Sequence, residues 1–198
     1  MQNFWNDRYS STSDFIYGKE PNEFFKSQID LLKPGKILLP CDGEGRNGVY
    51  AARIGWDVFA FDQSMEGQKK AMSLAKEYSV GLNYEIADAL AITYLENSFD
   101  AIALIFSHLP TAVREKFHAK AISWLKPGGT LILEAYNPLQ LNNNTGGPKD
   151  VSMLYTPELM KADFGRLSKL DIKTEHLAIN EGEFHSGISD VIRVIGVK

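Results

Sequence analysis

The sequence predicts an α/β protein built on a doubly wound, mainly parallel sheet of seven strands that ends in an antiparallel hairpin. Short apolar runs alternate with longer segments of helical period, which is typical of consecutive βα units. A glycine-rich loop follows the first apolar run. Near the end of the chain, residues 170–179 and 188–197 alternate apolar with polar residues on either side of a turn, which indicates a hairpin.

The individual elements follow from the apolar runs and from the residues that flank them. The run 99–106 is almost entirely apolar, as expected of a central parallel strand that is buried on both faces. Residues 137–153 are rich in Asn, Gly and Pro and predict a long loop, after which Thr156 caps a short helix. The other strands are expected at 37–39, 57–61, 82–87 and 130–135, and the other helices at 20–32, 49–54, 65–78 and 110–125.

Length and composition indicate a single domain in a reducing compartment. The chain has 198 residues, enough for one sizeable core, and its only cysteine is Cys41, which predicts a cytoplasmic protein. No signal peptide is expected, and no apolar stretch approaches the roughly 20 residues that span a bilayer, so a membrane partner is not expected. The net charge of −4 does not favour phosphate backbones, so nucleic acid is not expected as a partner either.

The glycine-rich loop carries the clearest functional signal. Gly43, Gly45 and Gly48 form the pattern G-x-G-x-x-G between a predicted strand and a predicted helix, where it indicates a ligand site more than a plain turn. Glycines let the backbone turn tightly and approach a ligand closely, and the helix N-terminus offers unpaired N–H groups. The loop residues predicted to contact the cofactor are Cys41, Asp42, Gly43, Glu44, Gly45 and Asn47.

Two acids follow the next two predicted strands. Asp62 comes about 20 residues after the loop, where a carboxylate accepts hydrogen bonds from ribose hydroxyls. Asp88 closes the third strand, where an acid can accept from an adenine amine. Alternatives stay open, because Asp62 and its neighbours also suit a helix N-cap and Asp88 also suits a solvated strand end. The residues predicted to contact the cofactor here are Asp62, Gln63, Ser64, Asp88 and Ala89.

The charge of the loop distinguishes between two cofactors. Asp42 and Glu44 would oppose the two phosphates of NAD, whereas they suit the sulfonium and ammonium groups of S-adenosylmethionine. The chain also lacks room for a separate catalytic domain, and the hairpin does not belong to the six-stranded parallel dinucleotide fold. S-adenosylmethionine is therefore the predicted cofactor. An NAD-dependent oxidoreductase and a non-catalytic cofactor-binding protein of the same fold remain as alternatives.

These motifs resemble those of class I S-adenosylmethionine-dependent methyltransferases. The resemblance rests on the residues 37–47 (ILLPCDGEGRN), Asp62, Asp88 and 126–131 (KPGGTL). The similarity covers nearly the whole chain, and the thiopurine and tellurite-resistance type is indicated by 5–9 (WNDRY), 17–22 (YGKEPN), 45–47 (GRN) and 182–185. It implies that the cofactor lies across the ends of the first three strands, with Asp62 on the ribose and Asp88 by the adenine.

The loop departs from the family pattern at two positions. Leu39 stands where an acid is common and Cys41 where a glycine is common, so Asp42 is expected to replace the missing acid. We expect a Rossmann-like fold with one methyltransferase domain over 1–198. Its parts are an N-terminal cap segment and helix (1–33), a cofactor-binding core (34–137), an active-site loop (138–155) and a C-terminal helix and hairpin (156–198).

The methyl acceptor is expected to be a small molecule, with a thiol or another chalcogen nucleophile suggested by the resemblance. His108 follows the fourth strand, where class I enzymes place groups that face the acceptor, so it is the candidate general base, with a capping or structural role as the alternative. His185 is expected to be solvated, and His118 and His176 structural. The residues expected to form the substrate site and lid are Trp5, Tyr9, Tyr17 and Ser107. For the aromatic residues of the N-terminus, Trp5, Tyr9, Phe15 and Tyr17, a small apolar cluster is the alternative.

Neither a metal nor one oligomeric state is indicated. The four histidines show no metal-ligand spacing, so no metal is expected. A monomer and a homodimer are both open.

Overall fold

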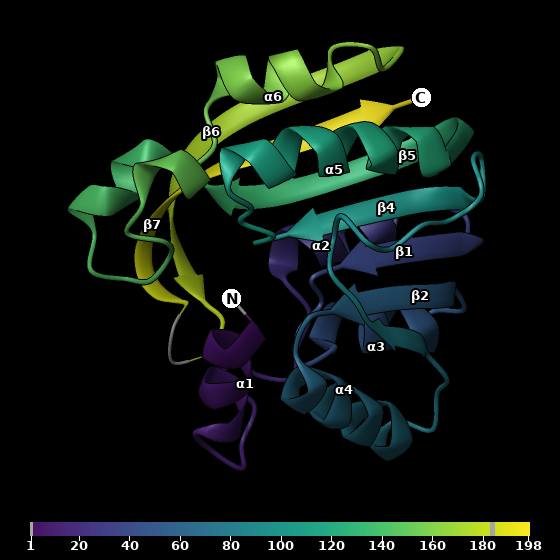
Figure 1. Cartoon of the computed structure of the whole chain (residues 1–198), viewed down its shortest axis with the longest axis vertical. Helices are drawn as coiled ribbons and strands as arrows, with labels where there is room; N and C mark the ends of the chain where they lie inside the picture. Colours follow the sequence, from purple (N-terminus) through teal and green to yellow (C-terminus); the bar gives the residue numbers. More distant parts are fainter. Residues whose placement is uncertain (1, 183–184) are drawn as a thin grey trace.

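The computed structural model describes residues 2–182 and 185–198, and the described chain alternates helices with strands (Figure 1). The strands are β1 (Lys36–Pro40), β2 (Asp57–Asp62), β3 (Asn83–Ile86), β4 (Phe99–Ile105), β5 (Leu125–Tyr136), β6 (Lys169–Asn180) and β7 (Ser186–Val197). The helices are α1 (Gln2–Ser10), α2 (Glu23–Ile29), α3 (Arg46–Arg53), α4 (Met65–Glu77), α5 (Thr111–Trp124) and α6 (Pro157–Phe164). Two short 3-10 helices, η1 (Pro138–Asn142) and η2 (Val151–Met153), occupy the predicted long loop.

The strands form one sheet in the order β3-β2-β1-β4-β5-β7-β6. The first five in this order are parallel, whereas β7 is antiparallel to both β5 and β6. The predicted Rossmann-like α/β class with its C-terminal hairpin is thereby confirmed. Because the strand order reverses between β1 and β4, a crevice is expected at the carboxyl ends of these strands.

The two largest apolar clusters of the described core lie on opposite faces of the sheet. On one face Phe117 of α5 and Phe164 of α6 pack against Leu131 of β5. On the other face Phe25 of α2 and Ile37 of β1 share a cluster with residues of α3 and α4. Each of these five side chains is fully buried, so the sheet is held rigidly from both sides.

The N-terminal helix α1 was not predicted. It lies on the side of the sheet to which the arrowheads of β1 and β4 point (Figure 1). The Ser64 hydroxyl, at the start of α4, donates to Asn6 Oδ1 at 2.7 Å, and Tyr9 is 4% exposed. Contacts with the rest of the protein therefore stabilise this short helix, which its own sequence pattern does not indicate.

Two boundaries also differ from the prediction. The helix α2 begins only after Asn22, because the Asn22 side chain accepts the Phe25 N–H at 2.7 Å and so forms its N-cap. The residues 126–129, expected to end a helix, lie within β5, since α5 already ends at Trp124.

The glycine-rich loop continues into α3 with Gly45 as its N-cap. Gly45 has φ +83°, a left-handed conformation, and a Cβ placed there would lie 2.5 Å from the Ala71 Cβ in α4. The absence of a side chain at Gly45 therefore allows α3 and α4 to approach each other. The structure thus gives Gly45 a packing role, and the predicted contact of Gly45 with the cofactor stays a prediction.

We expect Gly45→Ala to lower the free energy of unfolding by about 2–4 kcal/mol, since the added methyl group is both strained in φ and overpacked against α4. Urea unfolding followed by circular dichroism measures this loss. Gly81→Ala is the matched control, because a Cβ there meets nothing within 4 Å, and it should change stability little. Equal stability of the two variants would contradict the proposed packing role.

Candidate active site

A cavity of about 640 Å³ opens at the carboxyl ends of β1, β2 and β4, where the reversal of strand order predicts a crevice. Its wall comes from α1, the glycine-rich loop, the strand ends, residues 144–153 and His185. The predicted site residues that line it are Trp5, Tyr9, Tyr17, Cys41, Asp42, Gly43, Glu44, Asn47, Asp62, Gln63, Ser107 and His108. Those that do not line it are Gly45, Ser64, Asp88 and Ala89.

Gly43 lines the cavity, and both its N–H and its carbonyl group are hydrogen-bonded. Its N–H donates to Asp62 Oδ2 at 3.2 Å, and its carbonyl accepts the Tyr84 hydroxyl at 2.7 Å. A Cβ at Gly43 would lie 2.3 Å from the Tyr9 hydroxyl oxygen, so α1 covers the loop closely at this point. Only glycine fits here without displacing Tyr9, and its φ of +52° also favours glycine.

Asp62 is the buried carboxylate of the cavity. Its Oδ1 accepts the Ser64 N–H at 2.9 Å, in addition to the bond from Gly43 to Oδ2. Burial raises the pKa of Asp62 to about 6, since the charged form is poorly solvated there, and the backbone N–H donors oppose this rise. Each oxygen accepts one backbone donor and has lone-pair capacity for one more, as recognition of a diol requires.

The two acids of the glycine-rich loop line the cavity, and both also have partners within the protein. Glu44 is buried and forms an ion pair with Lys70 at 2.9 Å, and it also accepts the Tyr17 N–H at 3.2 Å. Its charge is therefore compensated within the protein. Asp42 accepts the Gly48 N–H at 3.1 Å and so caps α3, and burial raises its pKa to about 8.

Asp88 and Ser64 make local contacts outside the cavity. The exposed Asp88 accepts the Leu90 N–H at 2.8 Å and the Gln63 side-chain amide at 3.3 Å. Ser64 is fully buried and accepts the Gly67 N–H at 3.0 Å, which makes it the N-cap of α4. For Ser64 the capping alternative is thus the one that the contacts favour.

A buried polar network joins the glycine-rich loop to the hairpin. Arg46 Nη2 and Glu181 Oε2 are 2.6 Å apart, and both side chains are 8% exposed. The Asn22 side-chain amide donates to Glu181 at 2.9 Å and to Glu134 at 2.8 Å. The backbone N–H of Asn22 donates to Asn47 Oδ1 at 2.9 Å. Four segments that are distant in the sequence are therefore fastened together behind the cavity.

The network extends from Glu134 to the surface. Arg193 of β7 forms ion pairs with the buried Glu134 and with the part-exposed Glu175 of β6. Burial raises the pKa of Glu134, although Arg193 opposes this rise. Sequence analysis missed these residues, yet a glutamate within an otherwise apolar strand was a usable signal, because buried charges are normally paired.

His108 has both ring nitrogens engaged by the backbone. Nδ1 and the Met153 carbonyl are 2.7 Å apart, and the Tyr136 N–H donates to Nε2 at 3.2 Å. These contacts assign the proton to Nδ1, and burial lowers the pKa of the ring to about 4. Both ring nitrogens are thus engaged, which favours the structural alternative for His108, in which it holds η2 against β5.

His185 was expected to be solvated, and this expectation is wrong. The residue is 8% exposed and its ring lies against Phe106, Tyr17 and Tyr136, at centroid distances of 4.4, 4.5 and 5.5 Å. Its Nδ1 is buried and has no hydrogen-bond partner among the described residues. Burial lowers its pKa well below the usual value, so the ring is neutral. Residues 183–184 of the predicted hairpin turn lie outside the described residues.

Comparison with known proteins gives one consistent result. Residues 37–129 match the model of a methyltransferase domain. The chain is 24% identical to a thiopurine S-methyltransferase of Legionella pneumophila, over 96% of this chain and 94% of that protein. A SAM-dependent methyltransferase of Methanosarcina mazei has a similar structure, with a TM-score of 0.71 at 15% identity over 90% and 98% of the two chains. TehB of Haemophilus influenzae also reaches 0.71 at 15% identity, over 98% and 67%.

Residues 37–129 thus match a methyltransferase domain, and together with the fold these matches support a class I S-adenosylmethionine-dependent methyltransferase. S-adenosylmethionine is its cofactor. The alternative of an NAD-dependent oxidoreductase finds no support in these matches or in the antiparallel β7. Among the described helices, none is long and apolar enough to cross a membrane, and the described residues hold no group of three potential metal ligands.

The residues of the cavity fit this cofactor. The cavity is lined by the backbone of the glycine-rich loop at Gly43, over which Tyr9 packs closely, and by the buried carboxylate of Asp62, both at the ends of adjacent parallel strands. Aromatic rings from α1 complete the wall, with Trp5 stacked on Tyr9 at 5.6 Å between centroids. The Asp62 carboxylate can accept hydrogen bonds from a sugar, and the faces of the aromatic rings attract a cation. Together these groups suit a nucleoside that carries a sulfonium group.

We expect Asp62→Ala to weaken the binding of S-adenosylhomocysteine by about 1.5–3 kcal/mol, because charge-assisted hydrogen bonds to the ribose are lost. Asp62→Asn keeps the shape of the side chain but removes its charge, so it should show how much of the lost binding free energy depends on that charge. Isothermal titration calorimetry measures both. Asp88→Ala serves as the control, since Asp88 is exposed and outside the cavity, and it should bind almost as tightly as the wild type. Unchanged affinity of the Asp62 variants would remove this residue from the cofactor site.

Proposed function

We propose that this methyltransferase acts on a small, acidic nucleophile, either a thiol or another chalcogen compound, and that His185 accepts its proton. The observation that carries the proposal is the environment of His185. Its ring is buried in the wall of the cavity and is packed against Phe106, Tyr17 and Tyr136, and its Nδ1 has no hydrogen-bond partner among the described residues.

The lowered pKa of His185 favours an acidic acceptor. A buried imidazole stays neutral at physiological pH and is available as a base, but it is a weak one. A weak base assists the loss of a proton only when the donor is itself fairly acidic. Thiols, with a pKa near 8.5, meet this condition far better than aliphatic alcohols do.

The form of the cavity supports a small acceptor. Its volume of about 640 Å³ must hold the nucleoside, the amino-acid part of the cofactor and the acceptor together. The walls nearest His185 are aromatic, which suits a polarisable or planar molecule. One relative is named a thiopurine S-methyltransferase, so a sulfur acceptor is also what this similarity suggests.

The residues of the chain align the reactants and exclude water. S-adenosylmethionine, when bound, supplies a methyl group on a sulfonium that a nucleophile displaces in line. We infer that the glycine-rich loop and Asp62 fix the nucleoside, while Trp5 and Tyr9 close over it. The residues 138–155 and His185 then orient the acceptor. Such orientation is worth on the order of 7–11 kcal/mol of the barrier.

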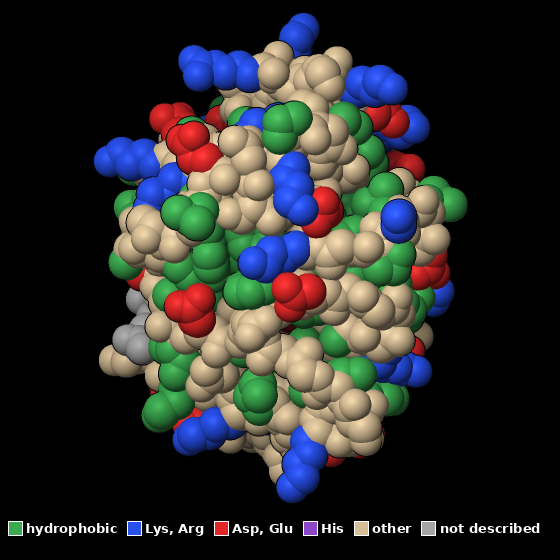
Figure 2. All heavy atoms as spheres, turned by 90° about the vertical axis from the view of Figure 1, so that its right-hand side faces the viewer, with side chains coloured by type: hydrophobic (Ala, Val, Ile, Leu, Met, Phe, Trp, Pro, Cys, Tyr) green, Lys and Arg blue, Asp and Glu red, His purple; other side chains and the backbone are tan. Residues whose placement is uncertain are grey.

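The surface agrees with a free small molecule as the partner. In Figure 2, Lys and Arg side chains are interspersed with Asp and Glu side chains, and the face shown has no large patch of a single charge. The net charge is −4. We infer that nucleic acid is not the substrate, since such proteins carry a basic patch or stripe. A cytoplasmic location is consistent with the lone Cys41.

Turnover of two kinds of thiol tests the role of His185. We expect His185→Gln to lower kcat about 10²–10⁴-fold for an alkyl thiol, which must lose its proton during the reaction. An aromatic thiol that is already ionised at the assay pH should lose much less. S-adenosylhomocysteine formation measures the rate, and calorimetry should find cofactor affinity nearly unchanged.

His108→Gln is the matched control in this experiment. Since both nitrogens of His108 bind backbone groups, this variant should lose thermal stability and should slow both thiols alike. The opposite pattern, with His108→Gln selective for the alkyl thiol, would restore the sequence-based assignment of the base. No turnover of any acceptor in a panel, despite cofactor binding, would favour the non-catalytic alternative.

A further inference from the structure

The strand β6 forms one edge of the sheet. It runs from Lys169 to Asn180 and, among the described residues, pairs only with β7 (Figure 1). Its outer side therefore presents backbone N–H and C=O groups that no neighbouring strand satisfies. A long exposed edge of this kind is a template for another strand unless side chains block it.

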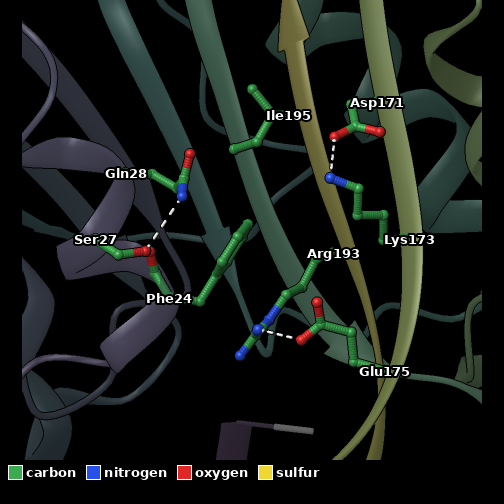
Figure 3. Close-up of a pocket in the computed structure, with 8 residues that line it drawn as sticks. All are labelled: Phe24, Ser27, Gln28, Asp171, Lys173, Glu175, Arg193 and Ile195. Atoms are coloured by element: carbon green, nitrogen blue, oxygen red, sulfur yellow. Dashed lines mark hydrogen bonds and ion pairs between the residues drawn. The ribbon is translucent and has the colours of Figure 1, made fainter.

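The charged side chains of β6 alternate in sign along one face. Lys169, Asp171, Lys173 and Glu175 are two residues apart, so they point to the same side of the sheet. Figure 3 shows the last three along a groove of about 280 Å³ between β6 and α2, and this groove also contains Phe24. Asp171 and Lys173 pair with each other at 2.8 Å, with both side chains more than half exposed.

We propose that β6 pairs antiparallel with β6 of a second copy of this chain, with Ile172 on the two-fold axis. In this register Lys169 lies opposite Glu175 of the partner subunit, and Asp171 lies opposite Lys173 of the partner subunit. The two-fold repeats both pairs, so four opposite-charge pairs cross the interface. Two seven-stranded sheets then join into one continuous sheet.

The charge pattern selects this register over its neighbours. A shift by two residues in one direction places Lys173 opposite itself and Asp171 opposite Glu175. A shift in the other direction places Asp171 opposite itself and Lys169 opposite Lys173. Both alternatives oppose like charges, which is unfavourable, and an odd shift exchanges the faces of the strand. If the edge strand carried only lysines, which prevent pairing between edge strands, these lysines would repel those of a second copy in every register.

The other face of β6 suits the same pairing. The centred register places the half-buried Ile172 against its own copy and Leu170 against Thr174. Apolar and β-branched pairs are favourable across antiparallel strands. The edge lies at the opposite end of the sheet order from β3 and does not line the cavity, so two active sites would remain accessible.

Sedimentation equilibrium over a concentration series tests the charge pairing. We expect the wild type to dimerise reversibly and more weakly at high salt. Lys173→Glu places two acids opposite Asp171 and should raise the dimer dissociation constant about tenfold or more. The exchange Asp171→Lys with Lys173→Asp restores opposite charges and should restore dimerisation. Lys76→Glu, an exposed change on α4, is the control and should have no effect.

Cysteine cross-linking tests the register without relying on charge. Ile172→Cys places two thiols opposite each other on the axis and should give a disulfide-linked dimer under mild oxidation. Leu170→Cys places them several residues apart and should not. Any one of four results would overturn the proposal. The wild type could stay monomeric at all concentrations, or its dimer could be unaffected by Lys173→Glu. The charge exchange could fail to restore dimerisation, or the two cysteine variants could cross-link equally.

Discussion

The buried ion pair between Arg46 and Glu181 is the constraint on which the site depends. Arg46 is in the first turn of α3, and Glu181 directly follows β6, 135 residues later in the chain. Asn22 binds Glu181 from the segment that leads into α2. Breaking a buried pair by removing one partner leaves an uncompensated charge and costs about 3–5 kcal/mol. The cofactor loop and the wall that carries His185 are therefore held as one unit.

Much of the fold could be predicted because it depends on local patterns. The strands appear as apolar runs, and the glycine-rich loop stands in the strand-turn-helix context that gives it meaning. The helix α1 could not be predicted, since residues 2–10 have no clear apolar face and are held by contacts such as that of Asn6 with Ser64. The packing role of Gly45 could not be predicted, because Ala71, which it faces, is on another helix.

The chemistry of the site was harder to predict than its position, because it depends on long-range partners. The carbonyl of Met153 and the N–H of Tyr136 engage His108, and neither contact follows from the residues beside it. His185 reaches the cavity only because the hairpin is fastened to α3. Glu44 is compensated by Lys70, so the preference for a cationic ligand rests on the cavity as a whole and on family membership.

The central claim is that the buried network keeps the cofactor site in its binding conformation. Calorimetric titration with S-adenosylhomocysteine tests this most directly, on two variants that each remove one charge from the network. Glu181 does not line the cavity, yet Glu181→Gln should weaken binding about tenfold or more, equal to at least about 1.4 kcal/mol, while circular dichroism shows a folded protein. Glu175→Gln, at the part-exposed end of the same network, should bind like the wild type. Wild-type affinity of a folded Glu181→Gln variant would contradict the account.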